Sequence, residues 1–542
     1  MLLHPVNEAI GLLENDLQMI LDGGSEKVGS PSNVPVAAAL RCTMFLTTLF
    51  FSVYMTVICL RLGSMASGQG QAPASRSSWE SRVAKAAGSL YLAPVVAILM
   101  ISTRLRAMEL AKNAQTGEPP MWAQACMYAA SMGFLVRFVA DVSMPATQGR
   151  VNRNSESLVT KTLRIVRNIF GGIIYASSCA IIMSTLTMEA PSGTTEALGC
   201  IMQCLLVLAG SHLFESGARD VYQAMPSRTA DSEVAGYGAA QGLSQKDDSD
   251  EGLPAGISLQ FSPMLCVLFV GIALRAVQLN LEPELWAMIA MYATTFAMLL
   301  QAARDTMRTV TRKGRTEDRP QQLLADEAAG PVRAAPGMEQ DDGADASFWS
   351  ATTLCIYVGT ALIMVCVFAM EPKPLSILIP SGSSSSPSGK VESQHPISTA
   401  MRCVMSLTVV YFTAYLVLMA GSLTKGVFGR WASHAASSVQ RSLAFAPMLC
   451  VMMIGVRLRA MQIGERDPPR WAQVSMVIAT VAVVTQVACS MLSEGEQNGD
   501  DKALASKIYL ITLLVMRYAA SLALFLGVGS LIISLAWMQP VL

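Results

Sequence analysis

The chain contains a succession of apolar runs about 20 residues long, which is the length that an α-helix needs to cross a bilayer. Hydrophobic residues make up 52% of its 542 residues and charged residues 14%, whereas soluble domains contain about 25% charged residues. A segment in lipid must satisfy its own backbone hydrogen bonds, as an α-helix does. The sequence therefore predicts an all-α, multi-pass integral membrane protein, with the lipid bilayer as its first partner.

Hydropathy and helix-ending residues place about 12 transmembrane helices along the chain. They are predicted at residues 36–60, 86–108, 122–143, 166–188, 197–217, 259–280, 285–304, 350–370, 399–422, 442–463, 471–492 and 508–537.

Four landmarks recur three times in the same order. The first helix of each set begins with ALRCTM (39–44), ALGCIM (197–202) or AMRCVM (400–405). The second carries a proline twelve residues before an arginine, the third opens with a tryptophan, and the fourth contains YASS, YVGT or YAAS. Such self-similarity predicts three four-helix repeats. Because each repeat has an even number of spans, the copies are parallel. A pseudo-threefold bundle is their simplest closed arrangement, and an open arc or a two-plus-one packing are the alternatives.

Polar stretches divide the chain between and within the repeats. The predicted organisation is an amphipathic N-terminal lead (1–33), repeat 1 (34–190), repeat 2 (191–373), a Ser/Pro/Gly-rich linker (374–397) and repeat 3 (398–542). Inside repeat 2, residues 226–256 and 310–346 are too polar to form a packed core, so they are predicted to be disordered linkers.

The distribution of basic residues predicts the orientation. Roughly twice as many lysines and arginines lie on the side of the loops after the first and third helices of each repeat as on the side of both termini. We therefore expect both termini to face the non-cytoplasmic side. The sequence does not identify the membrane.

Arginines gather where the second helix of each repeat ends and the first begins, at one predicted end of the bundle. They are Arg104, Arg106, Arg275, Arg457 and Arg459 in the second helices, and Arg41 and Arg402 in the first. The simpler interpretation is that they cap helix dipoles and reach toward lipid headgroups. The functional hypothesis is an electropositive ring that binds a small anion or an anionic headgroup. Neighbouring acids could neutralise such a ring: Glu109, Glu118, Glu282, Glu284, Glu465 and Asp467.

Two further residue types recur with the arginines. Trp122, Trp286 and Trp471 open the third helices, where aromatic side chains typically anchor a helix at the membrane interface. Pro94, Pro263 and Pro447 are predicted to lie inside the second helices, where a missing backbone donor permits a kink.

The sequence gives little support for nucleic-acid binding, metal binding or catalysis. Net charge is zero, which argues against nucleic acid as a partner. Each recurring Cys-x-Met motif places its two sulfurs about 200° apart on a helix, so they cannot bind one metal ion together; three cysteines, one per repeat, are the remaining metal hypothesis. The four histidines are scattered, which leaves no histidine-based catalytic pair. We therefore expect no enzyme activity, no cofactor and no metal site.

Ionisable residues inside spans are the usual indication of transport chemistry. Arg137 and Asp141 in the third predicted span, and His212 and Glu215 in the fifth, are the candidates. Two functions remain. One is a transporter or channel for a small, anionic or neutral solute. The alternative is a non-transporting membrane scaffold whose linkers recruit protein partners, which the sequence does not identify. A polar cavity that reaches mid-membrane between repeats would favour the transporter.

Overall fold

The fold comes from a computed structural model that describes residues 36–66, 83, 88–110, 118–144, 158–188, 196–224, 257–279, 284–328, 352, 354–363, 365, 398–423, 435, 438–440, 442–463, 468–493 and 504–537. Helices account for nearly all of these residues, and no strand occurs among them. The helices are α2 (Ala38–Ala66), α4 (Ala93–Leu110), α5 (Met121–Ser143), α6 (Leu158–Thr187), α7 (Glu196–Ala224), α8 (Ile257–Leu279), α9 (Leu285–Ala328), α11 (Thr399–Leu423), α13 (Ala446–Gln462), α14 (Arg470–Ser493) and α15 (Leu504–Trp537).

Seven helical segments are long and apolar enough to cross a membrane. They are Met121–Ser143, Leu158–Thr187, Gly199–Ala218, Leu285–Met307, Thr399–Leu418, Arg470–Leu492 and Val515–Ser534. Shorter apolar helices lie at Ala38–Tyr54, Phe261–Ala276 and Leu354–Ile363. The prediction of an all-α, multi-pass membrane protein is thus confirmed. Helix α4 is apolar only over its first part, because Arg104, Arg106 and Glu109 lie in its last two turns.

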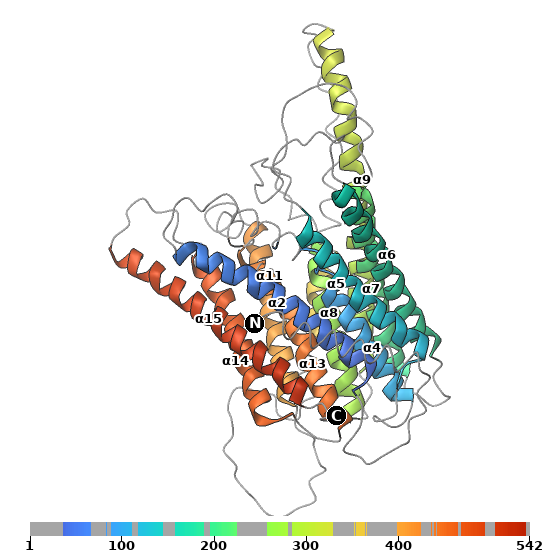
Figure 1. Ribbon diagram of the computed structural model, residues 1–542, viewed down its shortest axis with the longest axis vertical. Helices are drawn as coiled ribbons and strands as arrows, with labels where there is room; N and C mark the ends of the chain where they lie inside the picture. Colours follow the sequence, from blue (N-terminus) through green and yellow to red (C-terminus); the bar gives the residue numbers. More distant parts are fainter. Residues whose placement is uncertain are drawn as a thin grey trace, which may run out of the picture.

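The helix boundaries agree with most predicted spans, with one clear correction. Helix α9 does not end near residue 304: it runs for 44 residues to Ala328 and extends far above the other helices in Figure 1. The first part of the predicted linker 310–346 is therefore helical. Its Arg, Lys, Glu, Gln, Leu and Ala residues are good helix formers, and they extend a helix that the apolar segment has already nucleated. The lead 1–33 and the linkers 226–256 and 374–397 lie outside the described residues.

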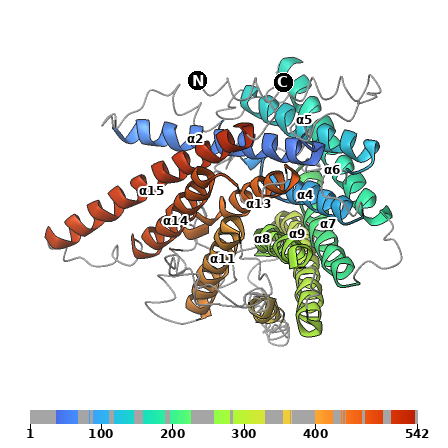
Figure 2. The same cartoon turned by 90° about the horizontal axis from the view of Figure 1, so that it is seen from below.

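Helices α4, α8 and α13 form the centre of the molecule. Each of them contacts the other two, and Figure 2 shows them toward the middle of the bundle. Every side chain from Ala93 to Leu105 and from Ala446 to Ala460 is buried, as is every side chain in 261–276. These three helices are therefore surrounded by protein on all sides.

Three helices close a ring around this centre. Helix α2 packs on α4 and α13, α7 packs on α8 and α4, and α11 packs on α13 and α8. Aromatic side chains fill two of these contacts. Phe445, just before α13, packs against Phe50, Phe51 and Tyr54 of α2. Each ring helix thus lies between two central helices.

Phe261 of α8 packs between α8 and α11 in the same way as Phe445 packs between α13 and α2. It packs against Tyr411, Phe412 and Tyr415 of α11. Phe261 and Phe445 both lie two residues before a proline, so the same local sequence makes the same kind of contact twice.

The remaining helices form the outside of the bundle. Helix α5 packs on α2 and α6, α9 packs on α7, and α14 packs on α11 and α15. Large apolar side chains of these outer helices are exposed, among them Val139, Ile165, Phe296, Val474 and Leu522. Burial of such side chains in lipid is the simplest use of this surface, so the exposed apolar residues fit a membrane environment.

The prolines of the central helices differ from the predicted kinks. Pro94 and Pro447 are the second residues of α4 and α13, where the backbone N–H has no helical partner to lose. Pro263 alone lies inside its helix, α8. Turn residues directly precede α4 and α13, so these two prolines lie in the first turns of their helices and do not bend them.

Candidate functional site

The predicted arginine cluster lies in the last turns of the central helices. Arg104 of α4, Arg275 of α8 and Arg459 of α13 are 1%, 2% and 1% exposed and are among the largest fully buried side chains of the protein. They are packed among helices and do not reach outward as the headgroup interpretation requires. We call the end of the bundle that is defined by these three residues the arginine end.

Arg106 and Arg459 each donate a hydrogen bond to a side chain of their own helix. The Arg106 Nη1 donates to Glu109 Oε2 at 2.6 Å, and the Arg459 Nη1 donates to Gln462 Oε1 at 3.0 Å. Both acceptors lie three residues after the arginine, one helical turn away. The motif is LRAMEL at 105–110, LRAVQL at 274–279 and LRAMQI at 458–463. Glu109 was among the acids expected to neutralise the arginines, and it pairs with Arg106; the neutral acceptor Gln462 was not predicted, although it recurs at the same spacing.

The charge of the acceptor differs between the copies. Glu109 is a carboxylate that neutralises Arg106, and both side chains are 11% exposed. Gln462 is a neutral amide that accepts a hydrogen bond from Arg459. The third motif also carries glutamine at this position.

A second positively charged side chain, Arg41, lies near Arg459. The half-buried Arg41 side chain of α2 lies beside Tyr128 of α5 and close enough to Arg459 of α13 for the two charges to repel each other. Two guanidinium groups therefore face the contact between α2 and α13. Arg402 occupies the same position of the motif on α11 and is also half-buried, and Arg457 of α13 is 8% exposed.

The acidic residues near the arginine end differ in their surroundings. Glu118 interacts electrostatically with Arg104, and Glu284 is exposed and accepts a hydrogen bond from the Trp286 indole. Glu282, Glu465 and Asp467 lie outside the described residues.

The three tryptophans are the second residues of α5, α9 and α14. Trp122 is 48% and Trp471 39% exposed, and Trp286 is partly exposed, as expected of interface anchors. The turns before α5 and α14 are built alike. Gln124 Nε2 donates to the Pro119 carbonyl, and Gln473 Nε2 donates to the Pro468 carbonyl, both at 2.8 Å.

The cysteines of the recurring Cys-x-Met motif point toward the outer helices. Cys42 of α2 lies beside Ser131 of α5, and Cys403 of α11 lies beside Thr480 of α14. These two thiols therefore face different helix pairs, which does not fit a shared ring. Within the described residues, no group of three histidine, cysteine, aspartate or glutamate side chains could hold a metal ion.

A second polar cluster lies where α5 and α7 end, opposite the arginine end. Arg137 of α5 donates from Nη2 to Asp220 Oδ2 of α7 at 3.0 Å, and the Tyr175 hydroxyl of α6 donates to the same oxygen at 3.1 Å. The Tyr91 hydroxyl lies 3.3 Å from that of Tyr175. The sequence indicated Arg137 as a candidate, but it did not indicate Asp220.

Nearby ionisable residues are also buried or paired. Asp141, one turn after Arg137, forms an ion pair of 3.0 Å with Arg167 of α6. His212 and Glu215 of α7 are 3% and 2% exposed. Arg137 and Asp141 are therefore each paired with a charge on another helix, and His212 and Glu215 lie buried inside the protein.

The third helices carry buried polar residues at matching positions. Fifteen residues after the tryptophans lie Arg137, Gln301 and Gln486, and all three are buried. Nineteen residues after them lie Asp141, Asp305 and Ser490, which are also buried. The neutral members were not predicted because they are not ionisable, and Asp305 was not predicted because it lies just beyond the predicted span 285–304.

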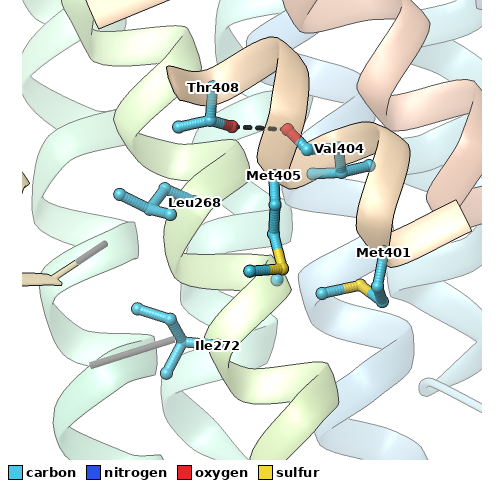
Figure 3. A pocket seen from close by; sticks show the side chains of 7 residues that line it. Leu268, Ile272, Met401, Val404, Met405 and Thr408 are labelled. Carbon is cyan, nitrogen blue, oxygen red and sulfur yellow. Dashed lines mark hydrogen bonds between the residues drawn. The ribbon is translucent and has the colours of Figure 1, made fainter. Parts of the chain in front are cut away.

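A small apolar cavity lies between α8 and α11. Leu268 and Ile272 of α8 face Met401, Val404, Met405 and Thr408 of α11 (Figure 3). Its volume of about 10 Å³ holds about one water-sized sphere. The Thr408 hydroxyl donates to the Val404 carbonyl at 2.8 Å, so its polar group is already satisfied. This cavity is not the polar mid-membrane path that would identify a transporter.

No family model, curated protein or solved structure matches the chain. The function must therefore be inferred from the residues.

Proposed function

We propose that the protein is a carrier of small anions, built from three parallel four-helix repeats around a pseudo-threefold axis. The observation that carries this proposal is the burial of Arg104, Arg275 and Arg459 at the ends of the three central helices. A buried guanidinium is costly unless its charge is used, and inside membrane proteins such charges mark solute pathways.

The helix contacts support the three-repeat arrangement. Each ring helix packs on the central helix of its own predicted repeat and on that of the preceding one: α2 on α4 and α13, α7 on α8 and α4, and α11 on α13 and α8. This pattern favours a closed bundle over an open arc or a two-plus-one packing. The repeated hydrogen bonds of Gln124 and Gln473 support the same correspondence.

The packing of the centre favours a carrier over a channel. The central helices are buried on all sides by mostly apolar side chains, including Leu99, Val267 and Met452, each 0–1% exposed. An open pore along the axis would need a polar lining. The proposed route therefore lies between repeats, where Arg41 of α2 lies near Arg459 of α13, and it requires the repeats to move.

The proposal is tested by uptake of labelled phosphate, sulfate and acetate into proteoliposomes. Replacement of both Arg275 and Arg459 with glutamine should reduce the initial rate about 10- to 150-fold, because a charge-assisted contact is worth about 1.5 to 3 kcal/mol. Arg106 stays unchanged because Glu109 neutralises it. The exposed Arg164 of α6 provides the matched control, Arg164→Gln, which should keep wild-type uptake. Equal rates in all three proteins would refute the proposal, as would a wild type that takes up none of the anions.

One observation favours the alternative function, a membrane scaffold. Helix α9 has 44 residues, or about 66 Å of helix, whereas the hydrocarbon core is about 30 Å thick. Its far part could bind a protein partner beyond the membrane. A chain that lacks residues 310–346 should keep full anion uptake if the protein is a carrier, whereas a protein that serves only as a scaffold has no uptake to keep.

A further inference from the structure

The polar cluster around Arg137 contains donors that the protein itself does not use. Arg137 is 5% exposed, and its Nη2 donates to Asp220. Its Nε and Nη1 atoms are buried and have no hydrogen-bond partner within the described part of the chain. Buried donors of a cation are rarely left without an acceptor, because their desolvation is costly. Two N–H groups of one guanidinium are thus available for another acceptor.

Hydroxyl groups lie close to the Arg137–Asp220 pair. The Tyr175 hydroxyl donates to Asp220 Oδ2, so its oxygen can accept from Tyr91, whose hydroxyl is 3.3 Å away. Ser216 of α7 lies beside Tyr91. All of these groups can donate a hydrogen bond, and two of them, Arg137 and Tyr175, donate to the Asp220 carboxylate.

The backbone of α6 leaves room beside the guanidinium. Gly171 lies next to Arg137, and a Cβ atom at this position would come within 3.5 Å of Nη1. Any larger side chain would therefore occupy the space next to this donor.

The two charged partners differ in their freedom to move. The Arg137 side chain is 6% exposed, whereas the Asp220 side chain is 29% exposed. The Asp220 carboxylate can be solvated by water if it turns away, but the Arg137 guanidinium cannot. If the carboxylate leaves, the buried cation needs another anion in its place.

We propose that Arg137 forms an oxyanion-binding site with Tyr175 and Tyr91, and that the Asp220 carboxylate occupies this site in the conformation described here. The ligand class is a phosphate group, because a planar guanidinium fork binds two oxygens of a phosphate or carboxylate and the hydroxyls can donate to a third. This inference goes beyond the carrier proposal: the site lies opposite the arginine end, and its occupancy is measured without transport.

The test measures the thermal stability of the purified full-length chain in detergent, with inorganic phosphate or with sodium chloride at equal ionic strength. Asp220→Asn removes the competing carboxylate, so it should bind phosphate at least about 10-fold more tightly than the wild type, which corresponds to about 1.4 kcal/mol. The added Arg137→Gln change in the same chain should abolish this gain.

The matched control is Asp141→Asn. Asp141 also pairs with an arginine between α5 and α6, but the Arg167 side chain is 33% exposed, so water can solvate the released cation. We expect no gain in phosphate affinity. A gain equal to that of Asp220→Asn would overturn the proposal, as would wild-type affinity in Asp220→Asn.

A second measurement applies if Asp220→Asn does not fold. Phosphorus NMR line broadening of inorganic phosphate reports binding to the wild type, and Arg137→Lys keeps the charge opposite Asp220 but loses the fork. The lysine variant should bind phosphate several-fold more weakly. Equal broadening by both folded proteins would contradict the site.

Nanodiscs distinguish the two sources of the phosphate group. Stabilisation of Asp220→Asn by inorganic phosphate in phosphatidylcholine identifies a soluble ligand, and stabilisation by phosphatidic acid without added phosphate identifies a lipid headgroup. Stabilisation in neither case would overturn the site.

Discussion

Single residues decide how this protein holds charge inside a bundle of apolar helices. At the arginine end, one acceptor three residues after a central arginine is a carboxylate, Glu109, and another is an amide, Gln462. The copy with the carboxylate is an ion pair, whereas in the copy with the amide the acceptor is uncharged and Arg41 lies nearby. The same local geometry therefore holds an ion pair in one place and a hydrogen bond to a neutral group in another.

We expect these two arginines to respond differently to replacement. Arg106→Gln leaves the Glu109 carboxylate without its cation, and loss of one partner of a buried ion pair costs about 3 to 5 kcal/mol. Arg459→Gln removes a hydrogen bond but also the repulsion from Arg41, so its cost should be smaller. Thermal unfolding in detergent should show the larger decrease for Arg106→Gln.

A double variant checks the cause. The Glu109→Gln change in the Arg106→Gln background should recover most of the lost stability, because no charge then remains unpaired. If both single variants are equally stable, or if the double variant recovers nothing, the Arg106 and Glu109 charges do not stabilise each other.

The sequence predicted which residues carry charge at these sites better than it predicted their partners. Arg106, Arg275 and Arg459 could be found because each of them follows a proline by twelve residues. Asp220 could not be found in this way, because it lies 83 residues from Arg137 and 45 from Tyr175. Only the packing of α7 against α4 and α6 brings them together.

At the scale of helices, close packing depends on small residues. In α15, a Cβ atom at Gly527 would lie 3.1 Å from both Ala479 Cβ and the Ser475 carbonyl oxygen of α14. Such approach of two backbones is typical of membrane helices, where van der Waals contact drives association. Gly529, two residues later on α15, has no atom within 4 Å of such a Cβ.

This contrast predicts the effect of two valine substitutions. Gly527→Val should destabilise the protein by about 1 to 3 kcal/mol, because the added atoms would force α14 and α15 apart. Gly529→Val adds the same side chain to the same helix and should have little effect. Thermal unfolding of both variants is the measurement, and equal stability would contradict the close contact.

Helix positions were more predictable than helix ends. Apolar length and landmarks located the helices, because burial in lipid or protein requires continuous apolar sequence. The extension of α9 to Ala328 was missed, because a polar sequence is compatible with both a linker and a solvated helix. The prolines were placed inside the helices, but Pro94 and Pro447 begin them, since a proline favours a first turn as well as a kink.

At the scale of the whole molecule, three central helices with three ring helices make a closed bundle. Each ring helix joins two central ones, so movement of a ring helix must change its contacts with both central helices. The sequence predicted parallel repeats, but it left their arrangement open, because their mutual contacts have no signature in one sequence.

The proposed orientation makes a direct prediction for this bundle. Both termini should face the non-cytoplasmic side, because basic residues are concentrated on the opposite side. Tags at Met1 and Leu542 in sealed vesicles of known orientation should resist a protease that is added to the cytoplasmic face. Digestion of both tags from that face would reverse the proposed orientation.

Counterflow in proteoliposomes tests the proposed carrier function most directly. Vesicles with the wild-type chain are preloaded with an unlabelled anion that the protein takes up, and the initial entry of the labelled anion is measured from outside. Since a carrier exposes its site to one side at a time, the preloaded anion should accelerate labelled entry several-fold, and the Arg275→Gln/Arg459→Gln variant should lose this acceleration. Labelled entry that is independent of the preloaded anion would indicate a pore, and no entry at all would indicate a scaffold; either result would contradict the carrier proposal.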